Sequence, residues 1–187
     1  MSYCTIIAFQ DGKPSESKEF QNAWGGAAYI WDSRWKAYEK NPNKEYDTWL
    51  CNDEGAKRLW ALAKRKDLPR FMRAVHVATF DRAIVKREHY LWFIKDLRDF
   101  TAHFPTTGEC HLYEWAKWIV GHSATEAIGF HHTSVSENLW DVRDDEATVD
   151  EDDIQMRPYD LNVDVGHFDV YEAITEYDQE QVTEGTR

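Results

Sequence analysis

The chain has 187 residues, of which 42% are hydrophobic and 14% aromatic, which suffices for one domain with a sizeable core and excludes a fully disordered protein. Its three cysteines form no CxxC pair, no apolar run reaches the ~18 residues of a membrane span, and the N-terminus lacks the basic flank of a signal peptide, so we expect a reduced, cytoplasmic protein. The net charge of −12 argues against nucleic acid as a direct ligand, because long-range repulsion would slow its approach.

The first third of the chain predicts a β-hairpin followed by two helices. Asp11-Gly12 is a hairpin-type turn signal, and it separates two segments of strand character. Further on, apolar residues recur at three- and four-residue steps, as Trp24, Trp31 and Trp35 illustrate, which is typical of amphipathic helices. We therefore expect strands at 2–9 and 15–20 and helices at 23–40 and 53–66.

The middle of the chain predicts a strand, two helices and a second strand. The β-branched and aromatic residues of "RAVHVATFDRAIV" predict a long strand at 73–85. The clearest helix lies at 87–104, where a wide apolar stripe ends before Pro105. We expect a shorter helix at 111–121 and a further strand at 127–135.

The last quarter of the chain predicts an irregular acidic loop at 141–158 and then a second hairpin. Apolar and polar residues alternate in "YDLNVDV", residues 159–165, which predicts a strand that packs on the domain and holds its aspartates outward. Residues 166–167 suit a two-residue turn, and 168–174 would return as the second arm. The predicted fold class is α+β, with a mostly antiparallel sheet of roughly four to six strands, about four helices and an acidic C-terminal hairpin.

The acidic charge is confined to the C-terminal end of the chain. Residues 141–187 contain sixteen of the 34 acidic residues and three of the 22 basic ones, a formal charge of −13, so residues 1–140 carry +1. The neutral body has one basic run, Lys57–Arg73, with seven bases and one acid. We expect both regions to pack as a single domain, with the acidic segment either neutralising the basic run or facing a positively charged partner.

The motifs that usually reveal an enzyme are absent from the sequence, which leaves the protein's status as an enzyme open but disfavoured. It has no phosphate-binding loop, no nucleophile elbow and no HExxH zinc motif. Cysteine and histidine residues do gather between 103 and 132, and these are zinc ligands, although their spacing matches no regular pattern. One alternative is therefore a metal-dependent hydrolase with ligands Cys110, His111, His122 and either His131 or His132, and with Glu109 or Glu126 as the base.

The charge pattern favours a binding protein without a cofactor. A fixed row of carboxylates resembles a row of phosphates to a basic groove, because lysine and arginine bind both anions. We therefore expect an inhibitor that imitates nucleic acid and occupies the basic, nucleic-acid-binding groove of a partner protein, a design that suits phage- or plasmid-borne anti-defence proteins. The expected contacts are Asp144, Asp145, Glu146, Asp150, Glu151, Asp152, Asp153, Asp160, Asp164 and Asp169.

A third interpretation is a structural or scaffold protein. The chain contains nine tryptophans, and this residue is enriched both in cores and in protein–protein interfaces. A scaffold would place several of them on its surface, at contacts between subunits. The sequence does not predict an oligomeric state, so the position of the tryptophans has to distinguish this interpretation from an ordinary aromatic core.

Overall fold

The computed structural model describes residues 3–21, 25–26, 29–30, 61, 65–106, 108–133, 139–144 and 154–175, and all that follows concerns these residues. The predicted helices at 23–40 and 53–66 lie almost entirely outside them. The elements in chain order are β1 (Tyr3–Gln10), β2 (Lys13–Gln21), α3 (Arg70–Val77), β3 (Ala83–Lys86), the 3-10 helix η3 (Arg87–His89), α4 (Tyr90–His103), α5 (His111–Gly121), β4 (Ala127–Thr133), β5 (Asp141–Arg143), β6 (Met156–Pro158) and β7 (Phe168–Asp169).

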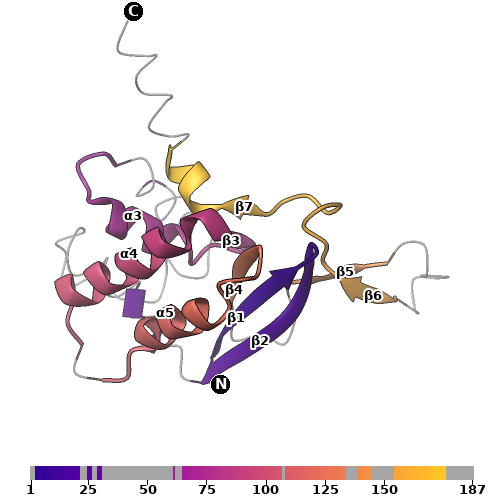
Figure 1. Cartoon of the computed structure of the whole chain (residues 1–187), viewed down its shortest axis with the longest axis horizontal. Coiled ribbons are helices and arrows are strands. Elements are labelled where there is room, and N and C mark those ends of the chain that lie inside the picture. Colours follow the sequence, from indigo (N-terminus) through magenta and orange to yellow (C-terminus); the bar gives the residue numbers. More distant parts are fainter. Residues whose placement is uncertain are drawn as a thin grey trace, which may run out of the picture.

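A five-stranded sheet in the order β2-β1-β4-β3-β7 forms the centre of the molecule (Figure 1). Its pairs are antiparallel except the last, in which β3 and β7 run parallel. Strands β5 and β6 form a separate two-stranded antiparallel sheet, which extends from the side of the molecule away from α3, α4 and α5. This arrangement confirms the predicted α+β class. Among the described helices, none combines the length and the apolar character that crossing a bilayer would need.

The N-terminal hairpin confirms the turn predicted at Asp11-Gly12. Strands β1 and β2 pair from Tyr3 opposite Gln21 to Gln10 opposite Lys13, so the turn consists of the two predicted residues. Asp11 has φ 53° and Gly12 has φ 80°, the left-handed conformations that a two-residue turn compatible with strand twist requires. The turn therefore fixes the register of the first two pairs, and the register shifts by one residue between Phe9 and Ala8.

The two helices predicted after the middle strand are also confirmed. The predicted helix 87–104 begins with the single turn η3 and continues as α4, with its apolar stripe buried and its end just before Pro105. The predicted helix 111–121 coincides with α5, and the strand predicted at 127–135 is β4. In the two helices, the periodicity of the apolar residues matches the face that is buried, which explains why the local sequence pattern was sufficient to predict them.

The strand predicted at 73–85 is wrong, because the chain forms α3 there, then a turn, and only then the short strand β3. Residues 72–79 are all buried, although Arg70, Arg73 and His76 recur at the three-residue steps of a helix, and this polar stripe is the signal that the strand prediction overlooked. Pro69 directly precedes the helix, a position where its missing N–H costs nothing. Pro69 thus marks the start of α3 as well as the end of the chain segment that precedes it.

The three middle strands of the central sheet, β1, β4 and β3, are buried on both faces. Side chains alternate along β1, so that Cys4, Ile6 and Ala8 pack under the helices, whereas Ile7 and Phe9 face the opposite side. On that second face, a smaller cluster contains two large aromatic side chains from the C-terminal quarter, Trp140 and Tyr159. The acidic segment thus supplies one layer of the core.

We predict that Gly129→Ala destabilises the protein by about 1–3 kcal/mol, because the core is already fully packed at this position. Gly129 lies on β4 beneath the ring of Trp140, and an added Cβ would approach that ring to 2.7 Å and the ring of Phe9 to 2.9 Å. Urea denaturation monitored by tryptophan fluorescence would measure the change. The matched control is Gly121→Ala, where no atom lies within 4 Å, and equal stabilities of the two variants would contradict this account.

Candidate functional site

The root of the β5–β6 hairpin is fixed by Trp140, which precedes β5, and Tyr159, which follows β6. Both side chains are fully buried, their rings contact each other edge to face with centroids 5.3 Å apart, and the backbone N–H of Tyr159 donates to the carbonyl of Trp140 at 2.8 Å. The indole N–H of Trp140 donates to the carbonyl of Phe130 in β4 at 3.1 Å. Removing a buried aromatic side chain of this size costs about 3–5 kcal/mol, so the root is a strong anchor.

The two strands continue outward from this root in a defined register. Asp141 lies opposite Pro158 and Arg143 opposite Met156, and the N–H of Asp144 donates to the carbonyl of Gln155 at 2.8 Å. The predicted irregular loop at 141–158 is therefore wrong at both of its ends, where ordered strands pair. The chain between them, residues 145–153, which we call the acidic connection, contains six acidic residues and no basic one.

The ten acidic residues predicted to contact a partner fall into two groups. Six of them lie in the acidic connection, outside the described residues: Asp145, Glu146, Asp150, Glu151, Asp152 and Asp153. The other four, Asp144, Asp160, Asp164 and Asp169, are described. Asp144 is partly exposed at the outer end of the hairpin. The remaining three belong to the body of the domain, where each has a role within the fold.

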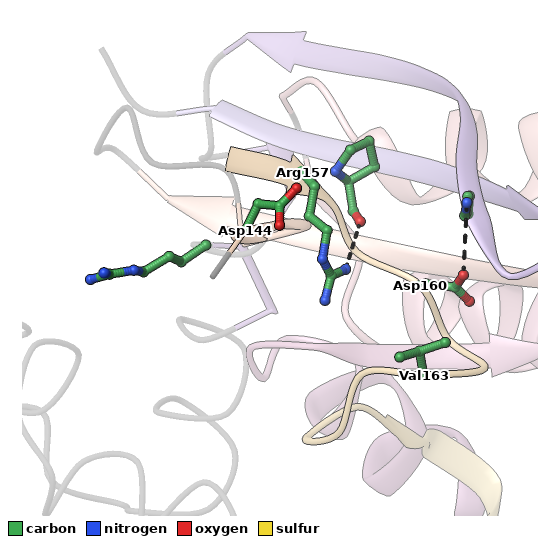
Figure 2. Close-up of a pocket in the computed structure, with 7 residues that line it drawn as sticks. Asp144, Arg157, Asp160 and Val163 are labelled. Atoms are coloured by element: carbon green, nitrogen blue, oxygen red, sulfur yellow. Dashed lines mark hydrogen bonds and ion pairs between the residues drawn. The ribbon is translucent and has the colours of Figure 1, made fainter. Parts of the chain in front are cut away.

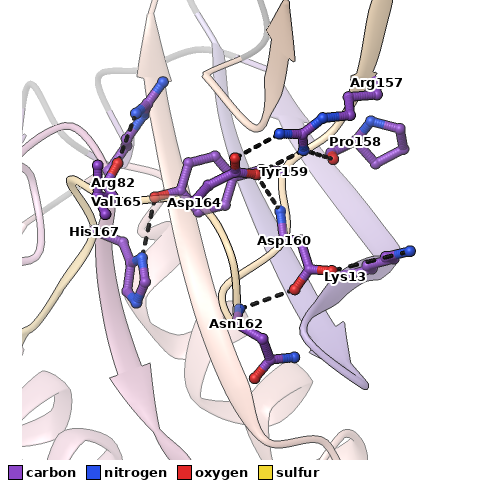
Figure 3. Close-up of polar contacts among 10 residues, drawn as sticks. All are labelled: Lys13, Arg82, Arg157, Pro158, Tyr159, Asp160, Asn162, Asp164, Val165 and His167. Carbon is purple, nitrogen blue, oxygen red and sulfur yellow. Dashed lines mark hydrogen bonds and ion pairs between the residues drawn. The ribbon is translucent and has the colours of Figure 1, made fainter. Parts of the chain in front are cut away.

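The strand predicted at 159–165 is wrong, because residues 161–163 form a tight turn. The N–H of Asp164 donates to the carbonyl of Asp160 at 2.8 Å, and the Asp164 carboxylate accepts the N–H of Asp160, also at 2.8 Å (Figure 3). Aspartate side chains that bond to nearby backbone compete with strand formation. The alternating valines consequently point to solvent, with Val163 70% and Val165 85% exposed.

Arg157 connects this turn to strand β6. Its guanidinium donates two hydrogen bonds to the Asp164 carboxylate, at 2.8 and 2.6 Å, a bidentate geometry (Figure 3). The hydrogen bonds from Arg157 and then from the Asp160 N–H lower the pKa of Asp164 to about 2. Asp164 is therefore ionised at neutral pH, but its charge is compensated within the domain.

Asp160 is likewise engaged within the domain, where the turn meets the N-terminal hairpin. Its carboxylate accepts the N–H of Asn162 at 2.9 Å and lies 4.0 Å from the ammonium of Lys13. The N–H of Leu161 donates to the carbonyl of Gly12 at 2.7 Å, and a Cβ on Gly12 would collide with the Asn162 side chain. The Asp11-Gly12 turn and the 161–163 turn thus support each other.

Asp169, near the end of the described chain, is buried and accepts hydrogen bonds from three backbone N–H groups. One carboxylate oxygen accepts the N–H groups of Tyr171 and Glu172, and the other accepts the N–H of Lys86 at 2.8 Å. This is helix capping, and residues 170–175 are helical, so the predicted second hairpin arm at 168–174 is wrong. With 2% of its surface exposed, Asp169 cannot reach a partner in this conformation.

A hollow of about 460 Å³ lies along the β5–β6 hairpin, from Asp160 and Pro158 near its root to Asp144 at its outer end (Figure 2). It is lined by side chains of mixed charge together with two apolar residues: Lys13, Arg143, Asp144, Arg157, Pro158, Asp160 and Val163. Cations and carboxylates alternate around it, so the hollow has no single sign of charge. In the sequence, the most acidic stretch is the acidic connection, residues 145–153.

Two residues of the basic run Lys57–Arg73 pair with acids of the body. Arg65 bonds to Asp67, and Arg70 donates to the buried carboxylate of Asp96 at 3.0 Å. These two ion pairs use acids from the first 140 residues.

The residues of the alternative metal site do not converge. No group of three histidine, cysteine or acidic side chains within the described part of the chain is arranged to hold a metal ion. His111 lies 3.5 Å from Glu109, and His122 lies 3.2 Å from Glu16 and stacks on Trp118. Burial raises the pKa of the Cys110 thiol, which disfavours the reactive thiolate. On the described residues, then, the hydrolase alternative lacks a site.

His131 and His132 are consecutive residues of β4, so their side chains point to opposite faces of the sheet, and both pack within the fold. His131 is buried and accepts the N–H of Leu139 at 3.3 Å, next to the root of the β5–β6 hairpin. His132 lies 3.2 Å from the carbonyl of Ala78. Burial lowers the pKa of His132 to about 4, so the ring is neutral at physiological pH.

Comparison with known proteins identifies no relationship: no family model matches the chain, and neither a curated protein nor a solved structure matches it. The geometry of the chain itself therefore has to carry any functional argument.

The β5–β6 hairpin was not predicted from the sequence, although a signal for it is present. Trp140 and Tyr159 flank the most acidic stretch of the chain, one on each side, and large apolar residues at both ends of a polar stretch are typical of an anchored hairpin. Strands of three residues are too short for their alternation to be recognised within so many charged residues.

We predict that Asp164→Asn lowers the free energy of unfolding by about 1 kcal/mol at pH 7, because the bidentate pair with Arg157 loses its charge. Since the pKa of Asp164 is lowered when folded, its contribution is present above the unfolded pKa and is lost as pH falls towards about 2. Urea denaturation of wild-type protein and of the Asp164→Asn variant at pH 7 and pH 2 measures the difference between their free energies of unfolding. If this difference is as large at pH 2 as at pH 7, the prediction is wrong.

We predict that stability decreases as pH falls from 6.5 towards 4, by up to about 3 kcal/mol, because the unfolded chain binds a proton that folded His132 excludes. Burial also lowers the pKa of His111 and His167, so these residues contribute in the same direction. The His132→Gln variant should lack only that part of the pH-dependent loss of stability that is due to His132. Denaturation curves of both proteins across this range test the assignment, and parallel pH profiles would overturn it.

Proposed function

We propose that this protein is an acidic binding protein that presents the carboxylates of residues 144–153 to the basic, nucleic-acid-binding groove of a partner protein, and so blocks or regulates that partner. The observation that carries the proposal is the position of the acidic connection. It joins two strand ends that are hydrogen-bonded at 2.8 Å through Asp144 and Gln155. Six of its nine residues are acidic, and no base accompanies them.

The fixed ends of the acidic connection favour binding. A free acidic tail loses conformational freedom along its whole length when it binds, whereas a segment closed at both ends has fewer conformations to lose. The root at Trp140 and Tyr159 holds the hairpin to the central sheet, and both ends of the acidic connection start from this hairpin. A localised negative field would steer a positively charged surface to this end.

The different roles of the acidic residues support the same proposal. Asp160, Asp164 and Asp169 serve turns, an ion pair and a helix cap, which gives them a structural reason to be present. The acids of the connection are flanked by Asp144 on one side and by Ile154 on the other, so a continuous run without any lysine or arginine remains. The partner contacts in this proposal are therefore Asp144 and the acids of 145–153.

The scaffold alternative has less support. Four of the nine tryptophans have described side chains, and three of these, Trp115, Trp118 and Trp140, are buried in the domain's own core. Trp92 is 49% exposed, but it stacks on His89 and contacts Tyr171 within the same chain. An aromatic core accounts for these residues without a subunit interface.

We predict that reversing three charges of the acidic connection, Glu146, Glu151 and Asp152 to Lys, abolishes partner binding and leaves the fold intact. Immobilised protein would be exposed to a lysate of the source organism at low and high salt, with and without competing duplex DNA. Wild-type protein should retain nucleic-acid-binding proteins that both salt and DNA displace, because the same basic groove binds either anion.

The matched control reverses three exposed acids of the body, Glu19, Asp81 and Glu88, to Lys. Each reversal adds two charges, so both variants change from −12 to −6 and differ only in the place of the change. The control should retain the partners, and circular dichroism should report folded protein in both cases. If the variant of the acidic connection binds the same proteins as wild type, the proposal is wrong.

A further inference from the structure

Strand β2 forms one edge of the central sheet and is the longest of the described strands. Its nine residues pair with β1 on one side, and among the described residues no strand pairs with its other side (Figure 1). Five consecutive residues, Ser15–Glu19, are exposed, whereas the opposite edge of the sheet, β7, has only two residues. An exposed edge strand presents backbone N–H and C=O groups to a further strand, so β2 is a candidate docking surface.

The charges of β2 balance one another, unlike those of the whole chain. The strand contains two bases, Lys13 and Lys18, and two acids, Glu16 and Glu19, so its formal charge is zero, whereas the chain carries −12. A strongly basic or acidic partner would need one sign of charge on the surface that it binds. A surface with both signs in equal number fits a second copy of itself instead.

Glu16 and Lys18 lie on the face of β2 that is turned towards the helices. Across the ladder, Glu16 is opposite Ala8 and Lys18 is opposite Ile6, and both of these β1 residues belong to the core on the helix side. The Glu16 carboxylate lies 3.2 Å from His122, but its side chain is 65% exposed and remains accessible to a second cation. One acid and one base therefore lie two positions apart on the same face of an exposed edge.

Charge selects one register for the pairing of two copies. A two-fold axis pairs the strands antiparallel and places one residue opposite itself, because residues that face each other across such a pair share a face. With Ser17 at the axis, Glu16 of each copy lies opposite Lys18 of the other. With Glu16, Lys18 or Glu19 at the axis, identical charges face each other. Ser15 is the extra residue where the register with β1 shifts, and this bulge interrupts the strand on the turn side.

We propose that β2 pairs with β2 of a second copy, antiparallel and centred on Ser17, so that two five-stranded sheets join into one. Backbone hydrogen bonds hold the two strands together, and the pairs between Glu16 and Lys18 set the register. Because the two-fold axis repeats each contact, a substitution at either position changes both ion pairs. This inference is independent of the proposed function, since no residue of the acidic connection takes part in it.

Sedimentation velocity of the full chain across a wide concentration range, at physiological salt, tests the pairing. Wild-type protein should show an equilibrium between monomer and dimer. Glu16→Lys and Lys18→Glu should each weaken dimerisation by about tenfold or more, because both cross-strand pairs become repulsive. The variant that combines Glu16→Lys with Lys18→Glu again has unlike charges opposite each other, so it should dimerise as wild type does.

The single variants control for total charge, because Glu16→Lys changes the net charge from −12 to −10 and Lys18→Glu changes it from −12 to −14. Glu88→Lys, a reversal at an exposed position of η3, is the matched control for Glu16→Lys and should keep the wild-type equilibrium. Circular dichroism should report folded protein for every variant. A wild-type chain that stays monomeric, a dimer that both single reversals leave unchanged, or a combined variant as weak as the single ones would overturn the proposal.

Discussion

The structure depends on covering the second face of its central sheet. Ile7, Phe9 and Ile84 point away from the helices, and an uncovered apolar face would cost stability in proportion to its area. Trp140 and Tyr159 provide the cover, and Gly129 leaves the space that the indole ring occupies. Because the same two residues begin and end the β5–β6 hairpin, the packing of the core also determines where the acidic connection leaves the domain.

Residues of one type have different roles in the acidic segment, depending on their surroundings. Near the core, Asp164 and Asp169 accept several hydrogen bonds each, and these contacts create a turn and a helix start where the apolar pattern indicated strands. The acids of the connection follow one another in the sequence between the two strand ends. Buried carboxylates must be paired, whereas carboxylates kept in water remain available to a positively charged partner. The proposed function assigns the acids of residues 145–153 to the partner and leaves Asp164 and Asp169 to the fold.

Several features followed from the sequence because local rules specify them. Asp11-Gly12 accepts the positive φ angles of a tight turn, and the apolar periods of 87–104 and 111–121 agree with helices that are buried on one face. The separation of a neutral body from an acidic end is a property of composition alone. For these features, neighbouring residues in the chain contain all the required information.

The tertiary structure decided the rest. Residues 73–77 are helical although their side chains favour strands, because they are buried on all sides and packing outweighs propensity. The three-residue strands β5 and β6 exist because Trp140 and Tyr159, nineteen positions apart, meet beneath them. The sequence by itself therefore determined the class of fold, the N-terminal hairpin, two helices and the location of the charge. Only the folded chain decided which acids are neutralised, since that depends on contacts between residues that local pattern cannot relate.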